Sequence, residues 1–391
     1  MVAPRCKTFK RFWPLTVVLA LWAVFLLSGQ DNRMVDFQVN DRAAKRLLAG
    51  ETLYPGSSVD GHYEFKYPPF AAILYIPFSL LPLSVAKSLW GLVVLSASAA
   101  VIGLSLKLAR FPAGFPRFML FLPGLVLARY FLRELHLGQV NAVVGFLLLL
   151  TLLLLLPPGN RSSGKTREGL AGALWGLAVT VKIYPLIFLP YFLIKRAWRT
   201  LAWGLAALPI AFLLPGFYYG FSGNLWVHKE WLSTLSRSTP HLLASQDNLS
   251  LLAVAFKYTG DHRLSLALWA LGLFLLGLIF LSVMARGRNL PHPELLEGAG
   301  LMLLIPLVSP LGWDYTFLLA APALALCFRH FFDIPVAWRI ALSLDAALIF
   351  LSLYDVLGRR LYSRFMSLSV PAFFFLLIFF LLAGLRRRRL A

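Results

Sequence analysis

The sequence predicts an all-α polytopic membrane protein, and three observations lead to this fold class. The 391 residues are 59% hydrophobic and only 14% charged, and the mean hydropathy is +0.74. Solid apolar blocks such as Phe146–Leu156 and Ala267–Val283 recur along the chain, and about 20 apolar residues suffice for a helix to cross a bilayer. A transmembrane β-barrel would show short alternating segments instead of such blocks.

The net charge of +20 lies mainly in short basic segments between the apolar blocks and at the end of the chain, such as Lys195–Arg199 and Arg386–Arg389. This is the positive-inside pattern of cytoplasmic loops. The positive net charge is therefore explained by basic loops on the cytoplasmic side of the membrane, and we expect no nucleic-acid partner. The two cysteines, Cys6 and Cys327, are too far apart in sequence to suggest a disulfide framework or a metal motif.

The first apolar segment, Phe12–Ser28, has basic flanking residues and no small-x-small cleavage site, which predicts a retained signal anchor. Residues 29–69 then form a large external loop. Phe70–Leu83 is short and bounded by proline, which favours an interfacial or re-entrant helix. The next three spans are expected at Ser84–Leu106, Phe115–Leu132 and Val140–Leu156.

The segment Gly169–Ile194 has basic clusters on both sides, yet its length fits only one crossing. Lys182 and Pro185 interrupt it near its middle. Two half-length helices would reconcile the charges with the length, because non-helical backbone at membrane depth is tolerated where it lines a protein cavity.

The remaining elements complete a single domain, residues 1–391, with about 10–13 transmembrane or half-membrane helices and both ends in the cytoplasm. A second external segment is expected at Gly220–Asn248 and a tight turn at Pro310–Asp314. Residues 329–391 hold the C-terminal spans and a basic cytoplasmic tail. The later spans are expected at Leu201–Tyr219, Leu264–Ala285, Leu295–Ser309, Tyr315–Phe328, Arg339–Leu353 and Ser367–Leu385.

Acidic residues gather in the first external loop, which holds six of the seventeen carboxylates in the chain: Asp31, Asp36, Asp41, Glu51, Asp60 and Glu64. Ionisable residues at the membrane edge are costly, so such a cluster is a functional hypothesis. Further polar residues are expected on the same face: Arg129, Arg133, Glu134 and His136 at one span end, Gln139 and Asn141 at the next, and Trp313 and Asp314 at the late turn.

These residue types fit glycosyl transfer. A carboxylate could take the proton of an acceptor hydroxyl as it attacks the anomeric carbon. Cations could stabilise the charge that gathers on a departing phosphate, and arginine binds phosphate bidentately. Aromatic and amide side chains could hold the sugar.

Several motifs, in this order, resemble glycosyltransferase family 87. They are Asp36-Phe37, Gly50-x-x-x-Tyr54, Phe65-Lys66-Tyr67-Pro68-Pro69, Gly138-Gln139-Val140-Asn141, Lys182-Ile183-Tyr184-Pro185, Gln246-Asp247-Asn248-Leu249-Ser250 and Ser309-Pro310-Leu311-Gly312-Trp313-Asp314. The resemblance spans roughly residues 30–320. Tyr315 stands where the family often has histidine.

The resemblance implies a GT-C-type bundle, a polyprenyl-phosphate-linked sugar donor, commonly with mannose, and inverting transfer to a lipid or glycan acceptor at the extracytoplasmic face of the cell membrane. It implies Asp36 as the general base, no cofactor and no metal. The candidate substrate-binding residues are Arg129, Arg133, Gln139, Asn141, Lys182, Tyr184, Asn248, Trp313 and Asp314.

Structural alternatives stand beside these roles. Asp41 is a rival base, and Lys182 could be a snorkelling lysine. Glu134 could be only the ion-pair partner of the two arginines. The alternative function is a transporter or flippase of a lipid-linked saccharide, since broken helices occur in transporters too. A related GT-C enzyme with a protein or lipid A acceptor is a third interpretation.

The other candidate residues have structural alternatives too. Gln139 and Asn141 could join neighbouring helices by hydrogen bonds. Trp313 could belong to an interfacial aromatic belt, and Arg129 and Arg133 could be interfacial anchors.

Overall fold

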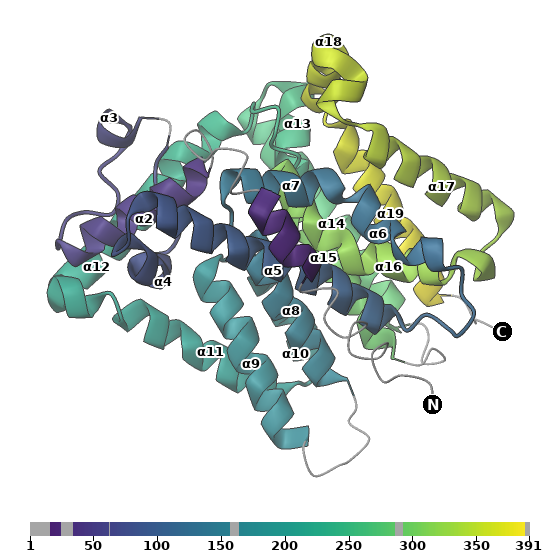
Figure 1. Ribbon diagram of the computed structural model, residues 1–391, viewed down its shortest axis with the longest axis horizontal. Coiled ribbons are helices and arrows are strands. Elements are labelled where there is room, and N and C mark those ends of the chain that lie inside the picture. The colour runs from purple at the N-terminus through teal and green to yellow at the C-terminus, as the bar shows by residue number, and fades with distance from the viewer. Residues whose placement is uncertain (1–15, 25–33, 62, 157–163, 286–291, 388–391) are drawn as a thin grey trace, which may run out of the picture.

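The computed structural model describes residues 16–24, 34–61, 63–156, 164–285 and 292–387 of the chain. Within these ranges the protein consists of helices joined by short loops (Figure 1). An antiparallel bridge between Asn248 and Trp313 is the sole β-type pairing in the described ranges. The predicted all-α class is confirmed. The terminal positions of the predicted anchor at Phe12–Ser28 lie outside the described residues, which cover only 16–24 of it. Asp31 lies outside the described residues altogether.

The helices and the 3-10 helices (η) follow one another along the chain with few residues between them. After a first helical stretch at residues 16–24 they are α2 Val35–Leu48, α3 Ser57–Asp60, α4 Pro69–Ser79, α5 Leu83–Ala109, η1 Arg117–Leu120, α6 Leu122–Val126, α7 Ala128–Leu137, α8 Asn141–Leu155, α9 Gly164–Val181, η3 Tyr184–Ile187, α10 Phe188–Ile194, α11 Trp198–Leu213, α12 Gly216–Leu242, α13 Leu251–Thr259, α14 His262–Ala285, α15 Pro293–Val308, η4 Asp314–Ala320, α16 Ala321–Arg329, η5 Phe331–Asp333, α17 Val336–Leu351, α18 Tyr354–Ser367 and α19 Val370–Arg387.

Three of the described helices, α5, α14 and α19, are long and apolar enough to cross a membrane. They confirm the spans predicted at Ser84–Leu106, Leu264–Ala285 and Ser367–Leu385. Two helix pairs, α11 with α12 and α17 with α18, pass the same test only as bent units, with bends of 93° and 96°. The 15-residue α8 extends only about 22 Å, less than the roughly 30 Å hydrocarbon core. The protein is therefore a multi-pass membrane protein in which several helices are shorter than a full crossing.

The span predicted at Phe115–Leu132 is wrong, because this segment is not one helix. It is divided into η1, α6 and the start of α7, with breaks at Phe121 and Leu127. Pro116 and Pro123 lie at the starts of the first two pieces, and proline cannot donate a backbone hydrogen bond within a helix. The amphipathic α7 that follows carries Arg129 and Arg133.

The break predicted within Gly169–Ile194 is confirmed. Helix α9 ends at Val181, and a new helical stretch starts with η3 at Tyr184. Lys182 and Ile183 form the break between them. The predicted turn at Pro310–Asp314 is also present, between the end of α15 and the start of η4. The second external segment, predicted at Gly220–Asn248, is mostly helical because α12 runs to Leu242.

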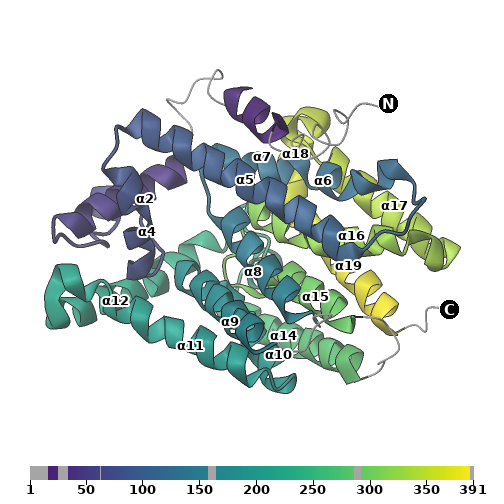
Figure 2. The ribbon, with the colours of Figure 1, turned by 60° about the horizontal axis from the view of Figure 1, so that its bottom comes forward.

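Helices α9 and α11 lie side by side (Figure 2), and glycines allow their close approach. A Cβ atom at Gly176 would lie 2.5 Å from the carbonyl oxygen of Gly204. One at Gly204 would lie 2.2 Å from the ring of Trp175. Small residues play this role in membrane helix pairs, where close backbone approach replaces the hydrophobic effect as the source of packing energy.

We expect Gly176→Leu to separate α9 from α11 and to lower the stability of the protein by roughly 1–3 kcal/mol or more. Thermal unfolding in detergent would measure the loss. Gly277→Leu is a matched control, because Gly277 lies within α14 and a Cβ atom there would have no heavy atom within 4 Å. Equal melting temperatures for the two variants would contradict the packing role of Gly176.

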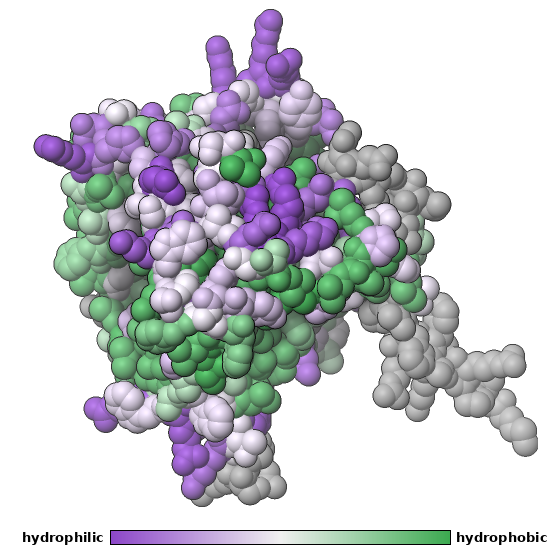
Figure 3. Space-filling model, turned by 90° about the vertical axis from the view of Figure 1, so that its left-hand side faces the viewer, coloured by the Kyte–Doolittle hydropathy of each residue, from purple (hydrophilic) through white to green (hydrophobic). Residues whose placement is uncertain are grey.

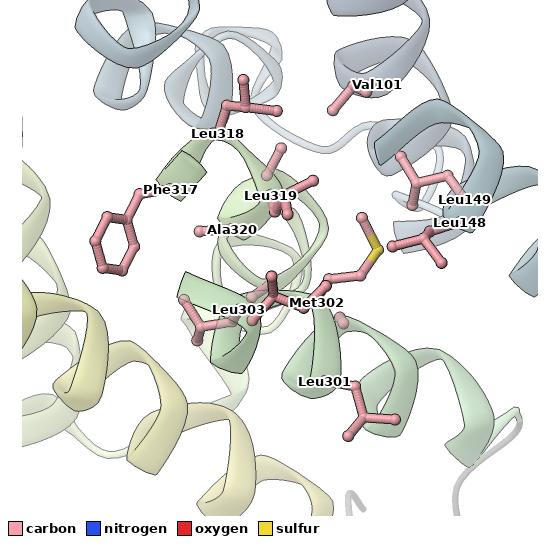
Figure 4. Close-up of a cluster of buried hydrophobic side chains, with 14 of the residues drawn as sticks. Val101, Leu148, Leu149, Leu301, Met302, Leu303, Phe317, Leu318, Leu319 and Ala320 are labelled. Carbon is pink, nitrogen blue, oxygen red and sulfur yellow. The ribbon is translucent and has the colours of Figure 1, made fainter. Parts of the chain in front are cut away.

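The main core lies where α5, α8, α15 and η4 meet. Figure 4 shows Met302 of α15 directed towards Leu148 and Leu149 of α8, with Leu319 and Val101 close by. On the side of the molecule that carries α2, α3 and α12, hydrophobic residues form a broad band, with many hydrophilic residues above it and a smaller hydrophilic group below it (Figure 3). The first external loop and its helix α2 belong to the hydrophilic end above the band.

Candidate active site

The position of Asp36 is fixed by the packing of α2 against the end of α7. Asp36 lies in the first turn of α2, and the backbone N–H of Met34 donates to the carbonyl oxygen of His136 at 2.8 Å. Gly138 ends α7 with φ +69°, and a Cβ atom there would lie 2.8 Å from the Cβ of Phe37. The glycine is needed both for its left-handed backbone and for this contact. As a result, the start of α2 lies beside Gln139.

Gln139 connects Asp36 to the neighbouring aromatic residues. Its side-chain amide donates to the Asp36 carboxylate at 2.6 Å and to the Tyr315 hydroxyl at 3.1 Å. Its carbonyl oxygen accepts a hydrogen bond from the Tyr67 hydroxyl at 2.9 Å. The amide therefore holds the carboxylate in one orientation while Asp36 still faces the cavity described below.

Lys182, at the break between α9 and η3, extends this network. Its ammonium donates to Asn141 Oδ1 at 2.7 Å and to Gln139 Oε1 at 3.2 Å. It also lies 5.0 Å from the ring centroid of Tyr67 and 5.6 Å from that of Tyr184, within the range of cation–π attraction. The Tyr184 hydroxyl donates to the same Asn141 oxygen at 2.8 Å. Lys182 is thus held by polar and aromatic partners within the protein.

Glu134 does not pair with Arg129 or Arg133, so the suggestion that it is only their ion-pair partner is wrong. Its carboxylate is fully buried and accepts hydrogen bonds from Asn141 Nδ2 at 2.8 Å and from the backbone N–H of Ala142 at 2.9 Å. Ala142 lies in the first turn of α8, where an anion is favoured by unpaired N–H groups and by the helix dipole. Glu134 therefore caps α8 and orients Asn141.

Two arginines of α7 converge on the buried carboxylate of Asp314. Arg133 donates to Asp314 at 2.7 Å and to Asp247 at 2.5 Å, and its side chain keeps 30% of its surface exposed. Arg129 lies 3.3 Å from the Asp314 carboxylate and is only 9% exposed. Arg129 also donates to the carbonyl oxygen of Ser352 and to the Tyr362 hydroxyl. Arg133 is therefore the one of the two that can meet a ligand.

Asn248 and Trp313 join two loops that are far apart in sequence. Asn248 is buried, and its side-chain oxygen accepts from the backbone N–H groups of Gly312 at 3.0 Å and Ser250 at 3.2 Å. Trp313 lies nearly parallel to Tyr315, with ring centroids 6.5 Å apart. Asn248 thus positions the loop that presents these two aromatic rings.

A cavity of about 430 Å³ lies at this junction. The predicted residues that line it are Asp36, Arg133, Gln139, Lys182, Tyr184 and Trp313. The other four predicted residues lie outside its lining. Asn141, Asn248 and Asp314 contact residues that do line it, whereas Arg129 reaches the buried Asp314. The rival base Asp41 is also outside the lining and pairs with Lys45 at 2.7 Å.

The cavity also contains residues that the sequence did not single out as site residues. Lys66 and Tyr67 belong to a motif that was recognised but not assigned to the site, and Asp247 likewise lies in a recognised segment. Trp231 of α12 had no sequence signal. Burial lowers the pKa of the Lys66 ammonium, while the carboxylates of Glu64 and Asp36 oppose this shift. Lys66 thus brings a second cation near Asp36.

An apolar groove of 180 Å³ adjoins this cavity, with which it shares Pro68, Ile183 and Trp231. Its other walls come from α4, α9, η3, α11 and α12, and they are formed by Phe70, Val179, Thr180, Leu186, Leu208, Ala211, Phe212 and His228. Among the described residues, no group of three or more His, Cys, Asp or Glu side chains is arranged to hold a metal ion. The site therefore combines a carboxylate, cations, aromatic rings and an apolar extension, in a membrane protein.

This combination fits a membrane-embedded transferase, and comparison with known families shows the family to which the chain belongs. Residues 65–310 match the model of Glycosyltransferase family 87, so the chain belongs to this family. A polyprenol-phosphate-mannose-dependent alpha-(1-2)-phosphatidylinositol mannoside mannosyltransferase of Mycobacterium tuberculosis is 27% identical over 331 residues, 80% of this chain and 74% of that protein.

Two further similarities were found. An alpha-(1->3)-arabinofuranosyltransferase of Mycobacterium tuberculosis is 28% identical over 254 residues, 63% of this chain and 54% of that protein. Among solved structures, ArnT from Cupriavidus metallidurans bound to undecaprenyl phosphate superimposes with a TM-score of 0.42 at 16% identity and covers 95% of this chain and 77% of that one. The protein is a glycosyltransferase.

Proposed function

We propose that this enzyme is an inverting glycosyltransferase that moves mannose from a polyprenyl-phosphate donor to a lipid or glycan acceptor. The observation that carries the proposal is the cavity in which the Asp36 carboxylate faces the same space as Arg133, Lys182 and Lys66. A base and phosphate-binding cations in one cavity are the two requirements of such a transfer. Asp36, as the catalytic base, and those predicted substrate-binding residues that line the cavity are part of this proposal.

The reaction assigns a role to each kind of group. Asp36 accepts the proton of the acceptor hydroxyl as its oxygen forms a bond to the anomeric carbon. The bond between that carbon and the phosphate oxygen breaks, and its electron pair stays on the departing lipid phosphate. Arg133 and the two lysines stabilise this negative charge, and attack from the face opposite the phosphate inverts the configuration. Trp313 and Tyr315 offer an aromatic surface to the sugar.

A lipid-linked donor fits the apolar groove that adjoins the cavity. A polyprenyl chain in this groove would leave the phosphate at the boundary between apolar walls and the cations. The names of the mycobacterial relatives contain the same donor type, polyprenol-phosphate-mannose. Membrane embedding also suits this donor, because its leaving group stays in the bilayer throughout the reaction.

The proposed working face is the extracytoplasmic side of the cell membrane. The basic segments Arg161–Arg167 and Arg286–Arg288 flank apolar runs in the manner of cytoplasmic loops. Figure 3 places hydrophobic residues beneath the hydrophilic end that carries α2, α3 and α12. A cavity at that end takes its acceptor from outside the cytoplasm.

The proposal is tested by supplying the purified protein with polyprenyl-phosphate-[¹⁴C]mannose and a lipid extract of the host. We expect label to appear in a new lipid or glycan. The same assay with polyprenyl-phosphate-[¹⁴C]arabinose tests the sugar, because arabinofuranosyltransferases also occur among the relatives. Translocation of labelled lipid in proteoliposomes without transfer of label would contradict the enzyme and favour a flippase.

The phosphate role of Arg133 gives a separate prediction. Arg133→Gln keeps hydrogen-bonding capacity but removes the charge, so the Michaelis constant for the donor should rise by about tenfold or more. Arg339→Gln is a control, because Arg339 is bound to backbone carbonyl groups of Phe332 and Ile334 and does not line the cavity. An unchanged donor constant in Arg133→Gln would remove the arginine from the phosphate site.

A further inference from the structure

Lys257 of α13 joins two segments of the chain that are far apart in sequence. Its ammonium donates to the carbonyl oxygen of Asn248 at 2.7 Å and to the hydroxyl oxygen of Ser369 at 2.9 Å. The carbonyl oxygens of Gln246 and Met366 lie at 3.3 and 3.5 Å from it. An ammonium has three N–H groups, so two of them make the shorter bonds and the third is shared between the longer ones. Lys257 lines neither the active-site cavity nor the apolar groove.

The first segment that Lys257 holds is the loop that carries Asp247. The two loop carbonyl groups bound by the ammonium belong to the residues on either side of Asp247. The carbonyl oxygen of Asp247 itself accepts from the backbone N–H of Asp314 at 3.0 Å. The carboxylate of Asp247 accepts two hydrogen bonds from Arg133, at 2.5 and 3.3 Å. The position of the Arg133 guanidinium at the cavity wall therefore depends on the position of this loop.

The second segment is the junction between α18 and α19, which lies at the same end of the molecule as α13 (Figure 1). Met366 is in the last turn of α18, where the helix dipole favours a cation. Ser369 follows with φ +53°, a conformation that residues other than glycine seldom adopt. Helix α18 also carries Tyr362, whose hydroxyl accepts from Arg129 at 3.1 Å. Lys257 thus fastens the Asp247 loop to the helix that binds the second arginine of α7.

The side chain of Lys257 is charged at pH 7. Burial lowers the pKa of its ammonium to about 8, and the carboxylate of Asp247 opposes this shift. Hydrogen bonds from a charged donor are stronger than those between neutral groups. One side chain can therefore hold both segments together.

We propose that Lys257 is a positioning residue of the donor-phosphate site, which acts through Asp247 to hold Arg133 in the orientation that binds the phosphate. The inference rests on the proposed transferase function, to which it adds a residue that lies outside the active-site cavity. Loss of the ammonium releases the loop, and the guanidinium loses its fixed place at the cavity wall. Asp36 lies on another helix and keeps its bond to Gln139, so the proton transfer is not affected.

The kinetics of label transfer by the full-length protein at pH 7 test this role. Lys257→Met removes the charge and the donors, so the Michaelis constant for the donor should rise about fivefold while the turnover number stays within about twofold of wild type. Lys257→Arg keeps the charge and should restore most of the donor affinity. Ser369→Ala removes one partner of the ammonium and should raise the donor constant about twofold, which keeps the test possible if Lys257→Met does not fold.

Tyr258→Phe is a matched control for a purely structural role. Tyr258 is the next residue of α13, and its hydroxyl donates to the carbonyl oxygen of Leu368 at 3.1 Å, in the same junction. If Lys257 only attached α13 to this junction, the two variants would act alike. We expect Tyr258→Phe to keep the donor constant of wild type. An equal rise of this constant in Tyr258→Phe and Lys257→Met would overturn the proposal.

A double-mutant cycle with Arg133→Gln shows whether Lys257 acts through the arginine. When the guanidinium is absent, Lys257→Met should raise the donor constant by less than about twofold, because no arginine is left to position. A further rise of about fivefold in the double variant would show that the two residues act independently. That result would also overturn the proposal.

Binding of polyprenyl phosphate, the donor lipid without its sugar, separates this inference from the proposed function. It is measured on the full-length protein in phosphatidylcholine nanodiscs. Weaker binding by Lys257→Met than by wild type, without sugar transfer by either, would keep the positioning role and contradict the transferase. Transfer by wild type with an unchanged donor constant in Lys257→Met would keep the transferase and discard the role of Lys257.

Discussion

Asp36→Asn should lower the turnover number by about 10²–10⁴-fold, the range expected for the loss of a general base. Asparagine keeps the shape of the side chain and can still bond to Gln139, which lies 2.6 Å from the Asp36 carboxylate. It cannot accept the proton of an acceptor hydroxyl. The Michaelis constant for the donor should change little, because the phosphate contacts come from Arg133 and the lysines. Initial rates of label transfer from the donor measure both quantities.

Asp41→Asn is the matched control, since Asp41 lies on the same helix and was the rival base in the sequence. Its carboxylate pairs with Lys45 at 2.7 Å and lies outside the cavity lining. We expect its turnover to stay within about threefold of wild type, because the Asp41 carboxylate pairs with the half-exposed Lys45 of the same helix and lies outside the cavity. Normal turnover in Asp36→Asn together with a large loss in Asp41→Asn would transfer the role of base to Asp41.

Helices long enough to cross the membrane could be predicted from the sequence, because their signal is local. The runs that became α5, α14 and α19 are apolar over a full crossing, so composition alone determines them. Phe115–Leu132 is also rich in apolar residues, but its prolines and its contacts with α16 and α17 divide it into short pieces. Hydropathy could not predict this division, since it depends on packing between segments that are about 200 residues apart.

The site shows the same contrast between local and distant signals. Asp36, Gln139 and Lys182 stood out as polar residues in apolar surroundings, and the structure brings all three to one cavity. The function of Asn248 in joining its loop to Gly312 depends on a pairing across more than 60 residues, which no spacing rule reveals. Trp231 gave no signal because an aromatic residue on an amphipathic helix is ordinary until its neighbours are known.

The role of Glu134 could not be predicted for a related reason. In sequence it lies beside Arg133 and five residues from Arg129, so an ion pair was the natural interpretation. On α7 its side chain instead turns towards the start of α8, where Ala142 offers an N–H group. The direction of a side chain on a short helix is determined by what the next helix presents.

Asp314→Ala should lower the stability of the folded protein by about 3–5 kcal/mol, the usual result of breaking a buried ion pair from one side. Asp314 is fully buried between Arg129 and Arg133. Without it, Arg129 keeps only neutral partners around Ser352 and Tyr362. Arg133 keeps Asp247, so most of the loss should come from the uncompensated charge of Arg129. Equilibrium unfolding in mixed detergent measures the change.

Asp333→Ala is the control for this prediction, because its carboxylate is 45% exposed and pairs with Arg329 at 3.7 Å. Exposed pairs of this kind contribute about 0–1 kcal/mol.

The double variant Arg129→Met/Asp314→Leu replaces the buried pair by apolar groups and should recover part of the lost stability, since the cost of desolvating the two charges is removed with them. If Asp314→Ala instead unfolds like wild type but binds the donor weakly, Asp314 contacts the substrate and its role is not structural. The position of Asp314 behind the guanidinium groups favours the structural role, in which a buried anion holds Arg133 at the cavity wall.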